Sequence, residues 1–369
     1  FNALGAVYSE ILLPFIEQRT DLDEIAIKRL FSYELSQVEA EAPDMIGFSI
    51  LSEHNLLYAL ALGRVIKAQF NIPILLGGAM MAHLETDELL NGFPWLDFVF
   101  SGEAEVSLSQ FLAAWSTGDI EGIDGLTHRN TGNPCRHLQP AQLDLSALPD
   151  PDFSDYDLNG YLAPEAVLPI ISSRGCYWGK CTFCSHTLPY GGGVRVRKPE
   201  TVIAEIKRQM ARYGVSNFLF VDEAISPRML RQLSEGILSN GLDIHFGAEG
   251  IRVEEAFDPA LLQTAYQAGL RWIYVGIESS IQRLLDLIEK GIKIEAIEDL
   301  IQTCRQIGIV PQLSFIVGLP TTTPEELEQE IKFMQQYAVD SSTYVLLYGS
   351  PMHARPDFFG IQIEERETL

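Results

Sequence analysis

The sequence has 369 residues and a formal net charge of −24 at pH 7, from 50 acidic and 26 basic side chains. This length exceeds what one hydrophobic core usually covers, so two domains are expected. The charge argues against a broad nucleic-acid-binding surface, which needs a basic footprint, and no apolar stretch approaches the roughly 20 residues that span a bilayer. We therefore expect neither a nucleic acid nor a membrane as a partner.

The first third of the chain alternates helical and strand-like segments. Residues 1–35 carry apolar side chains at helical spacing, and the chain opens at Phe1 with no evident strand before residue 45. Short apolar runs then predict buried strands separated by segments of helical periodicity. The expected strands are 45–51, 72–76 and 96–100, and the expected helices are 55–69, 85–91 and 106–116. This α/β pattern predicts a Rossmann-like parallel sheet over residues 1–120, shortened at its start.

Small or acidic residues follow each of these three strands. Ligands of parallel sheets bind in the crevice beyond the carboxyl ends of the strands, and glycine lets a ligand approach the backbone closely. The candidate ligand contacts are Ser49, Ser52, Gly77, Gly78, Gly102 and Glu103. The alternative interpretation is that these loops are only tight strand-to-helix turns.

The second half of the chain resumes the alternation after a break. Residues 121–165 are dense in proline, aspartate and glycine and predict a linker. Residues 166–345 contain six further βα units, which predict a partial (β/α)6 barrel, and residues 346–369 form a C-terminal extension. The expected strands are 167–172, 217–222, 244–248, 272–276, 312–317 and 342–347, and the helices are 199–213, 226–240, 258–268, 280–289, 293–307 and 323–337.

Three of the five cysteines, Cys176, Cys181 and Cys184, lie within nine residues of one another directly after the first strand of the second domain. Such a loop lies at the carboxyl end of the strand, where barrels place their chemistry. Three close thiolates can hold one face of an iron–sulfur cubane and leave one iron open to another ligand. The odd cysteine count does not fit a disulfide framework, so a reducing, cytoplasmic setting is expected. Structural zinc with His186 as a fourth ligand is the alternative.

At this point the segment resembles the radical S-adenosylmethionine (SAM) superfamily, whose first-strand loop carries three cysteines and ends Cys-x-aromatic-Cys. Here that ending is Cys181-Thr-Phe-Cys184, although four residues separate the first two cysteines where the family usually has three. The resemblance implies a [4Fe-4S] cluster whose open iron binds SAM. An electron from the reduced cluster then yields methionine and a 5′-deoxyadenosyl radical.

Later motifs match the family in order over residues 165–340. The resemblance implies that Asp222 and Glu223 accept hydrogen bonds from the methionine amino group and that Arg252 pairs with the methionine carboxylate. It further implies that Glu278 contacts the ribose and that Gly318 and Leu319 pack along the adenine, with Phe183 beside the cluster. Taken singly, each of these residues is equally well read as structural.

The N-terminal half resembles the cobalamin-binding domain that precedes the radical domain in one large subfamily. Its strand-end loops at 46–52, 73–78 and 98–105 match in order. The resemblance implies cobalamin between the domains and methylation of an unactivated carbon: one SAM methylates the cobalt and a second supplies the radical. It implies a small-molecule or peptide substrate and an electron donor such as flavodoxin or ferredoxin. The alternatives are cyclisation or rearrangement without methyl transfer, and a metal-binding protein without radical chemistry.

Overall fold

The computed structural model describes residues 11–17, 24–130, 133–136, 143–158, 160–185, 193–337 and 339–363. The chain divides into two compact units. The N-terminal unit holds the described residues up to 136, and the C-terminal unit holds those from 143 to 363. None of the helices in the described part of the chain is both long and apolar enough to cross a bilayer.

The N-terminal unit contains a five-stranded sheet whose strands follow one another in chain order. The first three strands are parallel, and the last two join as an antiparallel pair. The strands are β1 (Ile46–Ser49), β2 (Ile74–Gly77), β3 (Phe98–Phe100), β4 (Leu126–Asn130) and β5 (Asn133–Arg136). The helices are α2 (Leu13–Ile16), α3 (Glu24–Leu30), α4 (Ser32–Glu41), α5 (Glu53–Phe70), α6 (Thr86–Gly92) and α7 (Glu105–Ala114), with the 3-10 helix η2 (Ala79–His83).

The parallel part of this sheet agrees with the sequence, whereas two later features differ from it. Strands β4 and β5 lie in the stretch expected to be a linker, and β4 pairs with β3 instead of crossing between domains. Helix α4 runs beyond the expected end at residue 35, and Ala42 closes it in the left-handed region at φ 45°. The pairing of β4 depends on packing that periodicity does not report, since Leu126 and Thr127 are fully buried in a short segment.

The C-terminal unit contains a six-stranded, all-parallel sheet in chain order, together with a small antiparallel pair. The sheet strands are β6 (Val167–Ile170), β9 (Asn217–Phe220), β10 (His245–Ile251), β11 (Leu270–Glu278), β12 (Val310–Val317) and β13 (Val339–Thr343), and the pair is β7 (Ser173–Arg174) with β8 (Arg195–Val196). This order confirms the α/β partial barrel. The last strand begins three residues before the expected 342–347.

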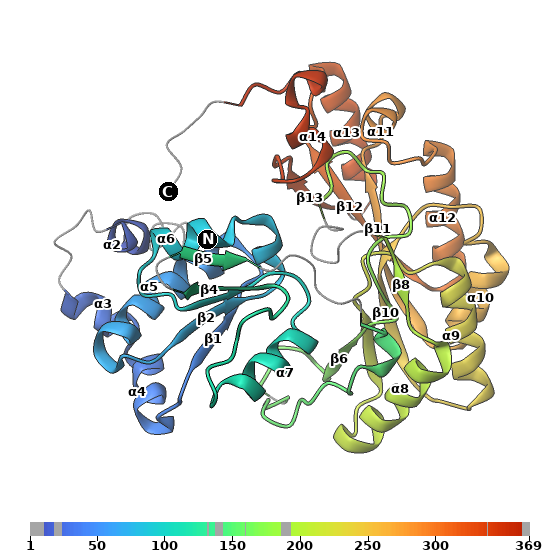
Figure 1. Ribbon diagram of the computed structural model, residues 1–369. Coiled ribbons are helices and arrows are strands. Elements are labelled where there is room, and N and C mark those ends of the chain that lie inside the picture. The colour runs from blue at the N-terminus through green and yellow to red at the C-terminus, as the bar shows by residue number, and fades with distance from the viewer. Residues whose placement is uncertain are drawn as a thin grey trace. The chain divides into compact units, whose positions relative to one another are not determined.

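Helices connect these strands and cover one face of the sheet. They are α8 (Pro199–Tyr213), α9 (Pro227–Ser239), α10 (Pro259–Gln267), α11 (Gln282–Leu287), α12 (Ile294–Ile307), α13 (Pro324–Gln336) and α14 (Pro351–Ala354), with the 3-10 helices η3 (Leu145–Ala147) and η5 (Pro356–Phe359). Figure 1 shows α8, α9, α10 and α12 in a row along one face. Proline in the first turn starts several of them, and left-handed Gly214 and Gly308 end α8 and α12, as local propensity favours.

The strand register slips at two places near the carboxyl ends of β10 and β11. The β10–β11 pairing shifts between Ala248 and Ile251, and the β11–β12 pairing shifts between Gly276 and Glu278. Gly250 and Glu278 both have positive φ, at 66°. Bulges of this kind re-aim side chains beside functional sites. They therefore decide where Arg252 and Glu278 point.

Candidate active site

The cysteine loop follows β7 at the carboxyl end of the sheet's first strand. Gly175 opens it at φ +85°, and an added Cβ there would lie 2.2 Å from the Gly193 carbonyl oxygen, so only glycine fits. The Gly175 N–H donates to Glu223 Oε2 at 3.0 Å, which ties the loop to the end of β9. Within the loop, the Cys184 N–H donates to the Cys181 carbonyl at 3.2 Å.

The far side of the loop is fastened to the segment after α11 and to the C-terminal segment. The Thr182 N–H donates to the Ile288 carbonyl at 3.0 Å, and the Trp178 indole donates to the Glu289 carbonyl at 2.9 Å. The Met352 N–H donates to the Thr182 carbonyl at 2.9 Å, and Met352 is fully buried. Residues 346–363 therefore take part in holding the loop. The sequence carried no signal for this, because one backbone hydrogen bond leaves no motif.

The Asp222 carboxylate is occupied by hydrogen bonds from Ser172 and Ser173. It accepts hydrogen bonds from the Ser172 N–H (3.0 Å), the Ser172 hydroxyl (2.8 Å) and the Ser173 hydroxyl (2.6 Å). Burial, which disfavours the charged form, raises the pKa of Asp222, although the serine donors oppose that shift. Asp222 thus joins the end of β9 to the start of the cysteine loop, and Glu223 beside it has one oxygen outside this network.

Arg252, Glu278 and Lys290 form a buried charged group at the carboxyl ends of β10 and β11. The Lys290 ammonium donates to Glu278 Oε1 at 2.7 Å, and the Ser314 hydroxyl lies 3.4 Å from Glu278 Oε2. The Arg252 guanidinium donates to the Lys290 carbonyl at 2.7 Å. Arg252 and Lys290 lie close enough to Cys181 to lower its pKa, against the larger effect of burial, which raises the pKa. Both cations line the same cavity as the three loop thiols.

These elements enclose a cavity of about 440 Å³. Eight of the side chains expected from the sequence line it together: Cys176, Cys181, Phe183, Cys184, Asp222, Glu223, Arg252 and Glu278. Polar side chains not predicted as site residues also line it: Glu249, Tyr274, Lys290, Ser314 and Ser342. The strands that supply them all end at the same edge of the parallel sheet, which is why residues far apart in sequence meet here.

The matched family agrees with this geometry, since residues 170–334 match the model described as the Radical SAM superfamily. This stretch of the chain is therefore similar to a radical SAM domain. Enzymes with this domain bind a [4Fe-4S] cluster and SAM. The resemblance of this stretch to the radical SAM superfamily is thereby confirmed.

Three similar proteins bear on the rest of the chain. The uncharacterized methyltransferase PH0819 of Pyrococcus horikoshii is 29% identical over 339 residues, covering 89% of this chain and 72% of the relative. The anaerobic magnesium-protoporphyrin IX monomethyl ester cyclase of Rubrivivax gelatinosus is 24% identical, covering 92% and 61%. The solved radical SAM methyltransferase TsrM from Kitasatospora setae, with cobalamin and a [4Fe-4S] cluster bound, is 20% identical with a TM-score of 0.69, covering 88% and 69%. This last likeness shows the fold over the 88% of this chain that it covers.

Two residues expected to pack along the adenine lie outside the lining of the cavity that holds the three loop cysteines. Leu319 is 2% exposed and belongs to the hydrophobic core, and Gly318 has φ +83° with open space around it. Ser314 and Ile316, earlier on β12, line the cavity instead. The adenine contact of Gly318 and Leu319 stays a prediction.

The residues of the N-terminal unit that were predicted to contact a ligand lie at the ends of β1, β2 and β3. Two of them stabilise or shape the loops themselves. Ser52 caps α5 by accepting from the Asn55 N–H, at 3.4 Å. Gly78 has φ +98°, and an added Cβ would lie 2.5 Å from the Ile50 backbone. Ser49 is exposed, Gly77 is buried, and Gly102 and Glu103 are half-buried. Their contact with a ligand stays a prediction.

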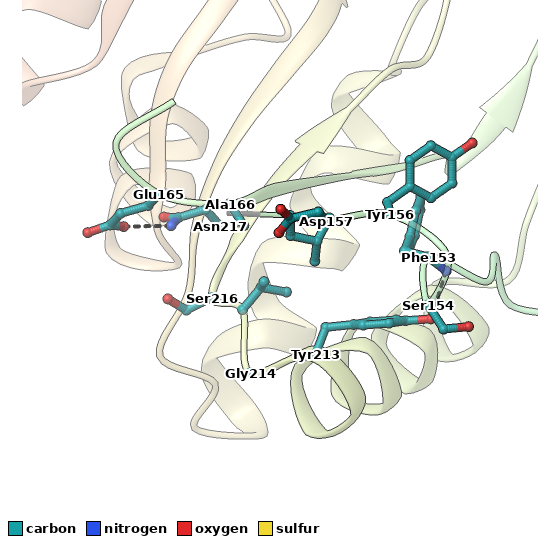
Figure 2. Close-up of a pocket in the computed structure, with 12 residues that line it drawn as sticks. Phe153, Ser154, Tyr156, Asp157, Glu165, Ala166, Tyr213, Gly214, Ser216 and Asn217 are labelled. Carbon is teal, nitrogen blue, oxygen red and sulfur yellow. Dashed lines mark hydrogen bonds between the residues drawn. The ribbon is translucent and has the colours of Figure 1, made fainter. Parts of the chain in front are cut away.

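A second cavity, of about 560 Å³, lies at the opposite ends of β6 and β9 (Figure 2). Figure 2 shows Asn217 donating to Glu165, at 2.7 Å, and the Tyr213 hydroxyl meeting the Phe153 backbone. None of the site residues expected from the sequence lines this cavity. Because barrels place their chemistry at the carboxyl ends of the strands, the cavity beside the cysteines is the candidate active site.

Proposed function

We propose that the chain is an iron–sulfur enzyme that reductively cleaves SAM to a 5′-deoxyadenosyl radical, and that it is a cobalamin-dependent methyltransferase acting on an unactivated carbon. The observation that carries the proposal is the single cavity that brings Cys176, Cys181 and Cys184 together with Glu223, Arg252 and Glu278. The name of the Pyrococcus relative and the fold of TsrM support methyl transfer. Since the chain spans 61% of the cyclase relative, the activity of the whole protein belongs to the proposal.

The donor set fits a [4Fe-4S] cluster. All three thiols are half-buried on one loop, and all three line the same cavity. Three thiolates can bind three irons of such a cluster, which leaves the fourth iron for SAM. When bound, the cluster supplies the electron that cleaves SAM. Residue 186, the fourth ligand of the zinc alternative, lies outside the described residues.

The chain's own residues would bind and orient SAM. Arg252 presents a planar guanidinium at the cavity wall, which suits a carboxylate. Glu223 keeps one carboxylate oxygen available for an ammonium group, because its other oxygen accepts from Gly175. Glu278 is held by Lys290 and faces the cavity near Ser314, where a ribose hydroxyl would donate. The protein's contribution is positioning and exclusion of water, since the cofactors carry the hard chemistry.

The edge of the N-terminal sheet suits a broad ligand such as cobalamin. Small residues end β1, β2 and β3, and Leu51 in the same edge is 72% exposed, which is unusual for a leucine beside a buried strand. Ser49, Gly77, Gly102 and Glu103 would approach the ligand, whereas Ser52 and Gly78 would shape the loops beneath it. A small-molecule or peptide substrate, a flavodoxin or ferredoxin as electron donor, and a cytoplasmic location complete the proposal.

Cyclisation or rearrangement without methyl transfer is the second candidate. The similarity to the anaerobic magnesium-protoporphyrin IX monomethyl ester cyclase favours it. Both candidates need the same cluster and SAM cavity. They differ in the number of SAM molecules consumed and in whether the product gains the mass of a methyl group.

The test is anaerobic reconstitution with iron, sulfide and cobalamin, followed by gel filtration and exposure to SAM and dithionite. We expect one cluster and about one cobalamin per chain, with 5′-deoxyadenosine released. Cys181→Ala should lose both the cluster and 5′-deoxyadenosine formation. Cys304→Ala is the matched control, because Cys304 is buried in α12 away from the cavity and should keep its iron. Full activity in Cys181→Ala would refute the site, and iron without cobalamin would favour the second candidate.

A further inference from the structure

Trp178 lies in the stretch between the first two loop cysteines, where this chain has four residues. Its indole N–H donates to the Glu289 carbonyl at 2.9 Å. The guanidinium carbon of Arg252 lies 4.2 Å from the centre of the Trp178 ring, so the two groups form a cation–π pair. Trp178 is outside the set of described residues that line the cavity, whereas Arg252 is within it. The indole therefore packs against Arg252 from outside the set of residues that line the cavity.

The turn after α11 is shaped to bring these two side chains together. Glu289 and Gly291 both adopt positive φ, at 49° and 69°. Two successive backbone carbonyls of the turn each accept one side-chain hydrogen bond. The Glu289 carbonyl accepts from the Trp178 indole, and the Lys290 carbonyl accepts from the Arg252 guanidinium at 2.7 Å. At Gly291, an added Cβ would lie 2.2 Å from the Trp178 ring. The indole thus fills the space that a side chain at 291 would occupy.

Few other contacts fix the plane of the Arg252 guanidinium. Arg252 is 5% exposed, and its Nε has no hydrogen-bond partner among the described residues. Glu254 lies 3.6 Å from that Nε, beyond hydrogen-bond reach, and accepts a hydrogen bond from Tyr177. A guanidinium binds a carboxylate through two parallel N–H groups only when its plane is fixed. Stacking on Trp178 fixes the plane together with the hydrogen bond from Arg252 to the Lys290 carbonyl.

We propose that Trp178 is a positioning residue that orients Arg252 toward the amino-acid carboxylate of SAM. The inference rests on the proposed function and deepens it. It couples the cluster loop to SAM recognition, because the segment that carries Cys176 and Cys181 also sets the arginine. Gly291 belongs to the same arrangement, because a side chain there would displace the Trp178 indole.

The test measures binding of three probes to anaerobically reconstituted full-length protein by equilibrium dialysis. SAM and S-adenosylhomocysteine carry the carboxylate, and 5′-methylthioadenosine lacks the amino-acid end. In Trp178→Leu we expect the Kd of the first two probes to rise about tenfold, within what a partly desolvated cation–π pair supplies, and the Kd of the third to stay unchanged. Trp178→Phe keeps a ring beneath the guanidinium and should recover most of the affinity. Gly291→Ala should reproduce the Trp178→Leu pattern by displacing an intact indole.

Iron content and a double variant distinguish a loss of Arg252 orientation from damage to the cysteine loop. Trp115→Leu in the N-terminal unit makes the same chemical change and should alter no probe. Adding Arg252→Met to Trp178→Leu should cost little more than Arg252→Met alone, since both remove one interaction. Unchanged SAM affinity in Trp178→Leu overturns the inference, as does equal weakening of all three probes or loss of iron. Failure of cluster-loaded wild-type protein to bind SAM overturns the proposed function itself.

Discussion

The Glu278 carboxylate accepts a hydrogen bond from the Lys290 ammonium at 2.7 Å, and the two side chains are only 9% and 8% exposed. Glu278 reaches this position from a left-handed backbone at φ +66°, at the register shift of β11. The pair lies over Gly276, where an added Cβ would be 2.6 Å from the Glu278 carboxylate and 2.9 Å from the ammonium. Strain stored in this way is typical of functional sites, because the surroundings must hold it in place.

Replacing one member of this pair should lower the free energy of unfolding far more than replacing both members together. Lys290→Met leaves the Glu278 charge buried without its partner, which costs about 3–5 kcal/mol in the free energy of unfolding. Glu278→Gln leaves the ammonium uncompensated and should cost a similar amount. The double variant should recover most of the loss. Urea unfolding of cluster-free protein measures all three, and losses that simply add in the double variant would contradict the coupling.

The parallel fold explains why the sequence predicts so much of the cavity. Hydrophobic runs locate the strands, and parallel strands end at one edge, so Glu223, Arg252 and Glu278 had to converge with the cysteine loop. Side-chain contacts between residues far apart in the sequence leave no comparable pattern in the sequence. Trp178 and Arg252 are 74 positions apart in the sequence, and only the turn at 289–291 brings them together. The same holds for Met352 on Thr182.

The limits of sequence analysis also have physical causes. The β4–β5 pair is short and polar, so its pairing with β3 decides its structure and periodicity does not reveal it. Leu319 lies in a motif that matched the family, and its side chain is 2% exposed in the core, so its contact with the adenine stays a prediction. A motif fixes which strand end a residue occupies. It does not fix which way the side chain points once a glycine such as Gly318 turns the chain.

The cysteines should differ sharply in reactivity toward iodoacetamide in cluster-free protein. Burial raises the pKa of Cys304 to about 12, so about one thiol in ten thousand is ionised at pH 8. Cys176, Cys181 and Cys184 are half-buried at the cavity and should be alkylated, with Cys181 gaining rate above pH 9 because burial raises its pKa too. Peptide mass spectrometry measures each site. Modification of Cys304 before the loop cysteines would show that the core opens readily.

Gly175 should be essential for the cysteine loop through steric contact rather than backbone conformation alone. Gly175 and Gly193 have similar positive φ, 85° and 77°, so alanine costs about 1–2 kcal/mol at either position from conformation. At Gly175 the new methyl would also meet the Gly193 carbonyl at 2.2 Å, whereas at Gly193 nothing lies within 4 Å. Gly175→Ala should therefore lose more than half of its iron on reconstitution while Gly193→Ala keeps it. Equal iron content in both variants would refute the steric argument.

Arg283 should stabilise the C-terminal unit in a pH-dependent way through Glu326. Two guanidinium nitrogens donate to the Glu326 carboxylate, at 2.8 and 2.6 Å, and the Thr323 N–H also donates to it, at 2.9 Å, in the capping box of α13. These donors, Arg283 first, lower the pKa of Glu326 from 4.5 to about 2. A depressed carboxyl pKa adds stability above the unfolded value, and that stability is lost as the pH falls through 4.5 toward 2.

Arg283→Met should thus lower the free energy of unfolding by about 0.5–1 kcal/mol at pH 7, a modest amount because Arg283 is about half exposed to solvent. The difference from wild type should shrink between pH 4.5 and pH 2 as Glu326 takes up a proton in both states. Urea unfolding of cluster-free protein across this range measures it, and Arg228→Met, an exposed arginine on α9, controls for the loss of a positive charge. A difference that stays constant with pH would mean that Arg283 acts through Thr321, to which it also donates, rather than through the charge of Glu326.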